Sequence, residues 1–163
     1  MDQIQPPIGR LPGAGQPAGG RSAWRHAAAL ATAVVIGVHG LLHLMGVALL
    51  WKLGQPGQLR YADAVPAPGS ADGYLVGGLW LVAALLFVAA AILLAAGRGA
   101  WRVAALAGVA VSASVIGLAP AAAADGLVVD GFILLLAADS WARARTALGD
   151  HPAPSGEETM GGD

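Results

Sequence analysis

Two histidines lie four residues apart in the apolar run VIGVHGLLHLMGVALLW, residues 35–51. Positions four apart share one face of a helix, so His39 and His43 would present two imidazole rings side by side. Such a pair can chelate a metal ion, bind a small polar ligand, or accept and release a proton. The alternative is a purely structural role, in which the rings hydrogen-bond across helices and fix the helix register.

Three further polar side chains interrupt apolar runs later in the chain, namely Ser112, Ser114 and Asp130. Straight helices with a rise of 1.5 Å per residue place all five polar groups roughly 2–8 Å to the outer side of the helix midpoints. A carboxylate at the centre of a membrane helix costs about 2.5–3.5 kcal/mol, so Asp130 should be protonated or paired with a histidine. We therefore predict a ligand or proton site that opens toward the outer face.

The ligand of this site stays open, because His39, His43 and Asp130 are also metal-ligand types. The motif HGLLH has Gly40 where the H-E-x-x-H metalloproteases carry their glutamate base. A haem between two histidines needs a ring from a second helix, and the later apolar runs contain no histidine, so only a dimer would supply one. We leave the identity of a metal or cofactor open, with His39, His43 and Asp130 as the candidate metal ligands.

Catalysis is not expected from this sequence. The chain has no cysteine, which removes thiol chemistry. It also has no recognisable nucleophile–base pair and no phosphate-binding loop. We therefore predict no catalytic residue and favour a protein that is not an enzyme.

The composition indicates the elements that must position these residues. The chain of 163 residues is 56% hydrophobic and 12% charged, whereas soluble domains are about 25% charged. A transmembrane helix needs about 20 largely apolar residues. Four runs approach or exceed this length, at about 24–51, 74–96, 101–119 and 126–141.

The predicted fold is all-α, an antiparallel bundle of four transmembrane helices, because the loops between the last three runs are short. This transmembrane domain covers residues 23–146. Residues 1–22 and 147–163 are rich in Gly, Pro and polar residues and are expected to be disordered tails.

The arginines predict the orientation. Cytoplasmic segments of membrane proteins carry an excess of Lys and Arg, and six arginines fall on one side of the predicted bundle. We therefore expect both termini to lie in the cytoplasm. The six arginines are Arg21, Arg25, Arg98, Arg102, Arg143 and Arg145.

The net charge of -1 does not indicate a nucleic-acid-binding surface, so we expect no nucleic-acid partner.

Small residues indicate how the helices pack. Gly40 and Gly46 lie on the histidine side of the first helix, and Ala104 and Gly108 form a small-xxx-small ridge with Ser112 on the third. We expect helices 1, 3 and 4 to pack together with the polar groups inside. The same ridges support an alternative function, an accessory or structural subunit that docks onto a larger membrane complex or onto a second copy of the chain.

Three segments carry a resemblance, HGLLHLMG, GLWLVAALLF and GLVVDGFILL. Over residues 35–137 the chain resembles a set of uncharacterised small bacterial four-helix membrane proteins whose first helix carries H-G-L-x-H-L-x-G. In size and helix number it is also similar to DoxX-type proteins. The resemblance implies a location in the bacterial inner membrane and a four-helix fold, and it implies no activity. Asparagine is common in those proteins at the position of Asp130, which implies that a charged metal ligand there is not essential.

Overall fold

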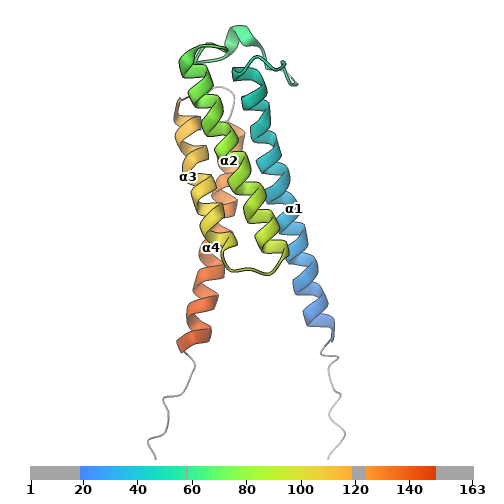
Figure 1. The fold of residues 1–163 in the computed structure, drawn as a ribbon. Helices are drawn as coiled ribbons and strands as arrows, with labels where there is room; N and C mark the ends of the chain where they lie inside the picture. Colours follow the sequence, from blue (N-terminus) through green and yellow to red (C-terminus); the bar gives the residue numbers. More distant parts are fainter. Residues whose placement is uncertain (1–18, 58, 119–123, 150–163) are drawn as a thin grey trace, which may run out of the picture.

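The computed structural model describes residues 19–57, 59–118 and 124–149, and it is all-helical in that part of the chain (Figure 1). Four long helices run up and down in turn, so the predicted four-helix, all-α fold is confirmed. A short 3-10 helix, η1, lies in the long connection between the first two. The elements are α1 (Gly19–Leu50), η1 (Tyr61–Asp63), α2 (Ala71–Ala95), α3 (Trp101–Leu118) and α4 (Ala124–Gly149).

Some helix ends differ from the predicted ones. α1 begins at Gly19, inside the predicted tail, and α4 continues past Trp141 to Gly149. The prediction equated each helix with its apolar run, but the polar segment ARARTALG after Trp141 also consists largely of good helix formers. The remaining tail residues, 1–18 and 150–163, lie outside the described residues.

α2 begins earlier than predicted because of a capping residue. The Ser70 hydroxyl accepts a hydrogen bond from the backbone N–H of Gly73 at 3.0 Å. A serine in this position satisfies one of the backbone donors left open at a helix start. The helix therefore begins at Ala71 and not at Tyr74.

α2 is the packing partner of both α1 and α3, whereas α1 and α4 touch only briefly. A Cβ added to Gly40 would lie 2.8 Å from Phe87 Cβ and 3.1 Å from the Ala84 carbonyl oxygen. One added to Gly46 would lie 2.5 Å from the ring of Trp80. These glycines of α1 thus face α2, which differs from the expected packing of helices 1, 3 and 4 alone.

The small residues of α3 also face α2. A Cβ on the buried Gly108 would lie 3.1 Å from the ring of Phe87, and the partly buried Ala104 packs against the same apolar core. The ridge predicted from Ala104 and Gly108 is therefore an internal contact of the chain.

Two apolar clusters fill the bundle interior and lie on either side of a polar layer. In α1 the buried histidines fall between Ile36 of the first cluster and Leu50 of the second. In α3 Ser112 falls between Val109 and Val115 in the same way. The bundle therefore keeps its buried polar groups in one layer between two apolar ones.

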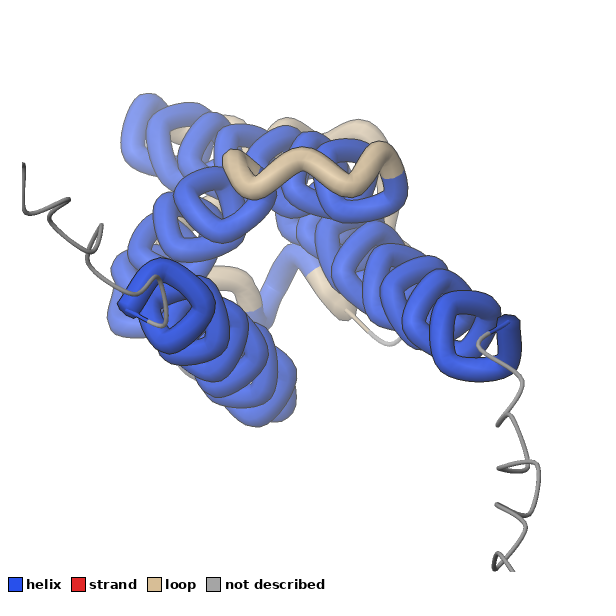
Figure 2. Tube along the Cα trace, turned by 90° about the horizontal axis from the view of Figure 1, so that it is seen from below, coloured by secondary structure: helices blue, strands red, loops and turns tan. Residues whose placement is uncertain are grey.

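Two of the described helices are long and apolar enough to cross a membrane, namely Ala23–Leu50 and Ala71–Ala95. Residues Trp101–Gly117 form a shorter apolar helix. The first residues of α1 and the last residues of α4 project past the turn between α2 and α3 (Figure 1). Seen from that end, the two projecting helix ends lie well apart (Figure 2).

Candidate functional site

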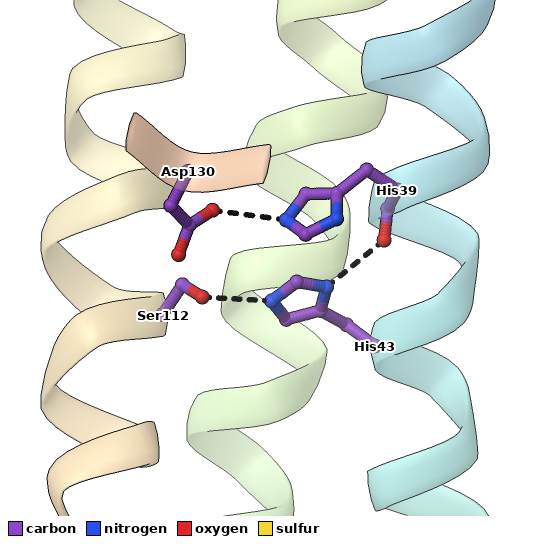
Figure 3. A network of polar contacts seen from close by, with 4 residues as sticks. All are labelled: His39, His43, Ser112 and Asp130. Atoms are coloured by element: carbon purple, nitrogen blue, oxygen red, sulfur yellow. Dashed lines mark hydrogen bonds and ion pairs between the residues drawn. The ribbon is translucent and has the colours of Figure 1, made fainter. Parts of the chain in front are cut away.

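Four buried polar residues from three helices meet in the polar layer (Figure 3). His39 and His43 come from α1, Ser112 from α3 and Asp130 from α4. None of them is more than 6% exposed to solvent. Four of the five side chains predicted as ligand or proton candidates therefore lie together in the structure.

His39 and Asp130 form a direct contact between α1 and α4. The ring nitrogen Nε2 of His39 lies 2.9 Å from Oδ1 of Asp130. The other carboxyl oxygen, Oδ2, is buried and has no hydrogen-bond partner among the described residues. In Figure 3 it points toward the side of Ser112. A buried oxygen without a partner costs free energy, so this atom needs a proton, a water molecule or another ligand.

Gly126 of α4 lies beside the His39 ring. A Cβ added to Gly126 would lie 4.0 Å from Cε1 of His39. Gly126 and Asp130 are four residues apart and therefore share one face of α4. This face of α4 is therefore turned toward the imidazole ring, and the carboxyl group one turn later reaches the ring nitrogen.

His43 is held in one orientation by two hydrogen bonds. Its Nδ1 lies 2.9 Å from the backbone carbonyl oxygen of His39, which can only accept, so Nδ1 carries the hydrogen. In a neutral ring Nε2 is then the acceptor, and it lies 3.0 Å from the hydroxyl oxygen of Ser112. The Ser112 hydroxyl therefore donates to His43 and joins α3 to α1.

Aromatic rings of α2 close the site on the remaining side. The ring centroid of Phe87 lies 4.9 Å from that of His39 and 5.3 Å from that of His43. The Trp80 ring lies 5.2 Å from His43. Phe87 is completely buried, so these contacts give the polar layer an apolar wall and a low local dielectric constant.

The sequence interpretation missed Trp80 and Phe87, although a signal was present. They are seven residues apart in a largely aliphatic helix, which places them on one face. That face lies against Gly40 and Gly46, the two glycines that we had assigned to close helix contacts.

Ser114 does not join the site. Its side chain is exposed and donates a hydrogen bond of 2.8 Å to the Ala110 carbonyl oxygen of its own helix. Residues two apart in a helix do not share a face, so Ser112 and Ser114 cannot both turn inward. The depth estimate grouped the two serines, but their directions around α3 separate them.

The arrangement supports hydrogen bonding and proton binding more directly than metal binding. The described residues contain no group of three His, Cys, Asp or Glu side chains placed to share a metal ion. The Nε2 atoms of His39 and His43 face different partners, Asp130 and Ser112. These two nitrogens are therefore engaged in hydrogen bonds, as is Nδ1 of His43.

No protein-family model, curated protein or solved structure matches this chain. The function must therefore be inferred from the site itself.

Proposed function

We propose that the protein is an integral protein of the bacterial inner membrane whose buried His39–Asp130 pair binds a proton. The membrane location is supported by the apolar outer surface of the bundle. Large apolar side chains point outward from three helices, for example Val34 (64% exposed), Leu85 (61%) and Leu135 (71%). Extensive exposed apolar surface is typical of a membrane-facing protein.

The orientation with both termini in the cytoplasm is supported by the distribution of arginines. The α2–α3 turn, the first residues of α1 and the last residues of α4 lie at the same end of the bundle (Figure 1). Arg25, Arg98, Arg143 and Arg145 belong to these segments, and all four are exposed. Positive charge collected at one end favours the cytoplasmic side for that end.

The helix register supports a site near the middle of the membrane. Gly40, which lies between the two histidines, packs against Ala84. Ala84 lies close to the midpoint of α2, which runs from Ala71 to Ala95. This position is deeper than the outer half indicated by straight-helix depths, because α1 extends beyond the bundle at its N-terminal end.

Proton binding is supported above all by the Asp130 carboxyl group, which shares Oδ1 with His39 and leaves Oδ2 unpartnered among the described residues. The pair is net neutral either as imidazolium with carboxylate or as imidazole with carboxylic acid, and both states hold one proton more than imidazole with carboxylate. Losing that proton would leave a net negative charge among apolar side chains, which is costly. The pair therefore has a physical reason to bind a proton.

The groups that face the His39–Asp130 pair from the other helices do not compete for its proton. α2 presents Phe87, which does not titrate, and α3 presents the Ser112 hydroxyl. Among the described residues, His43 is the one further titratable group in the layer, and its hydrogen bonds are to the His39 carbonyl oxygen and to Ser112. His43 extends the site toward α3 and forms no hydrogen bond with the Asp130 carboxyl group.

Nitrogen-15 NMR of histidine-labelled protein in lipid nanodiscs tests this function. The ring nitrogens of His39 should change their chemical shifts with pH, and Asp130→Asn should move that transition. His43→Gln is the matched control and should leave a transition at His39. A His39 ring whose shifts are constant across the accessible pH range, in the original chain and in Asp130→Asn alike, would refute proton binding.

The membrane location and orientation have their own test. The sequence contains no cysteine, so single cysteines can be introduced without competing labelling. A cysteine in place of Arg98 should react with a membrane-impermeant maleimide only after the cytoplasmic side is made accessible. One in place of Gln55, in the α1–α2 connection, should react in intact spheroplasts. The reverse pattern would overturn the proposed orientation.

The alternative of an accessory subunit receives less support. Its predicted docking ridge includes Gly108, which is buried against Phe87 within the bundle. A docking partner would therefore have to use another surface.

A further inference from the structure

An open apolar groove of about 790 Å³ runs along the outer face of α4 beside α3. It extends from Leu127 to Trp141, a distance of about 21 Å along a helix. Asp130 is buried on the inner face of the same helix, so the groove is separate from the proton site. Other residues that line it are Leu106, Gly131, Phe132, Leu135 and Ala138.

A cationic side chain lies at one end of this groove. Nε of Arg102 donates a hydrogen bond of 2.8 Å to the hydroxyl oxygen of Ser140, which joins α3 to α4. Arg102 lies one turn before Leu106, and Ser140 directly precedes Trp141, so the bridge adjoins the groove. The guanidinium is only partly buried and makes this one hydrogen bond among the described residues.

Among the residues that the structure describes, the positive charge of Arg102 has no acidic partner. The acid beside Ser140 is Asp139, and Asp139 forms an ion pair with Arg143. A guanidinium group has five N–H donors, and one of those of Arg102 is used by Ser140. The remaining donors suit a phosphate group, which arginine binds with charge-assisted hydrogen bonds.

We propose that the α3–α4 groove binds an acyl chain of an anionic phospholipid whose phosphate is held by Arg102. This inference rests on the proposed membrane insertion, which places Arg102 at the cytoplasmic surface. A groove of about 21 Å is longer than one leaflet of the hydrocarbon core, which is about 15 Å thick. An acyl chain that enters the groove beside Arg102 would therefore lie in the groove through the whole thickness of the leaflet.

A second copy of the chain fits this surface less well. Two copies with the same orientation in a membrane, related by a two-fold axis through this face, would bring the same surface patches together. The two Arg102 side chains would then approach each other at the same depth, and like charges repel. A lipid phosphate supplies the opposite charge.

Native mass spectrometry of detergent-purified protein tests the inference. Phosphatidylglycerol and phosphatidylcholine with identical acyl chains are titrated onto the original chain and onto variants. We expect preferential binding of phosphatidylglycerol, and Arg102→Gln should weaken it about tenfold, the effect of roughly 1.4 kcal/mol. Arg98→Gln is the matched control, because Arg98 is an exposed arginine in the nearby α2–α3 turn, and it should leave the preference intact.

A second pair of variants tests the groove. A Cβ at Gly131 meets no atom within 4 Å, so Gly131→Leu can fill the groove without disturbing the fold. It should reduce binding of both lipids. Gly117→Leu is the control, because Gly117 has equal space in α3 but does not line the groove, and this variant should bind both lipids as the original does.

Three results separate the possible failures. Equal binding of the two lipids by the original chain and by Arg102→Gln would overturn the lipid inference while leaving the membrane location untouched. A change of oligomeric state in Gly131→Leu, without any change in lipid binding, would assign the groove to a second copy. Release of the protein from membranes by alkaline carbonate would overturn the membrane location and the lipid inference together.

Discussion

His39 and Asp130 are 91 residues apart in the chain, yet Nε2 of one lies 2.9 Å from Oδ1 of the other. The contact joins α1 to α4, two helices that otherwise touch only briefly. Both side chains are almost fully buried, so neither can exchange its partner for bulk water. The pair therefore links the stability of the bundle to the chemistry of the site.

Substitution of Asp130 should separate the hydrogen bond from the charge. Asp130→Asn keeps a carbonyl oxygen that can accept from His39, so we expect a loss of unfolding free energy within about 1 kcal/mol. Asp130→Leu removes the acceptor and leaves a buried donor without a partner, which costs about 1–3 kcal/mol. Unfolding of both variants in mixed micelles measures the difference, and equal losses would show that the charge rather than the hydrogen bond stabilises the contact.

The hydroxyl group of Ser112 should contribute to stability, whereas that of Ser114 should not. Ser112→Ala removes the donor to His43 and should cost about 0.6 kcal/mol, the average for side-chain hydrogen bonds between helices in a bilayer, and at most about 1.7 kcal/mol. Ser114→Ala is the matched control, because the Ser114 hydroxyl bonds to its own helix and is exposed. Unfolding midpoints of the two variants check the expectation, and equal midpoints would contradict the inward placement of Ser112.

The sequence was sufficient to predict the number of helices and the polar layer. The apolar runs are long enough to be helices. His39, His43 and Asp130 stood out because ionisable residues inside such runs are rare and turn toward the bundle interior. The helical rise relates residues at one depth, so it brought Ser112 into the same group. It carries no information on direction around α3, which is why Ser114 was grouped with Ser112 although it faces outward.

The contribution of α2 could not be obtained in the same way. α2 is apolar on every face, so its hydrophobic pattern does not indicate which side meets the bundle. Depth from helix midpoints was also biased, because α1 continues beyond the bundle and its midpoint is not that of the buried segment. Close contacts such as Gly40 with Ala84 define the register, and these depend on two helices at once.

Two glycines of α1 should respond in opposite ways to alanine. A Cβ at Gly40 would lie 3.1 Å from the Ala84 carbonyl oxygen and 3.3 Å from the Val88 backbone nitrogen, atoms that cannot move aside without shifting α2. Overpacking of this kind costs about 1–3 kcal/mol, so Gly40→Ala should lower the unfolding free energy.

Gly37→Ala is the control for this substitution. Its Cβ would lie 3.5 Å from Ala91 Cβ, an ordinary van der Waals distance. Alanine is favoured over glycine in a helix by about 1 kcal/mol, so Gly37→Ala should be neutral or stabilising. Unfolding in mixed micelles compares the two variants, and similar losses in both would contradict the close α1–α2 contact at Gly40.

Phe87 should connect the packing of α2 with proton binding by the site. Phe87→Ala would leave a cavity between the two histidine rings and the Gly108 side of α3, and such truncations cost about 3–5 kcal/mol. Water that enters the cavity would hydrate the Asp130 carboxylate and reduce the cost of its negative charge. The pH dependence of the His39 ring nitrogens should therefore change together with stability. Leu85→Ala, at a residue that is 61% exposed, should change neither. A Phe87→Ala protein with lower stability but the original His39 transition would show that the aromatic wall stabilises the bundle without governing the proton.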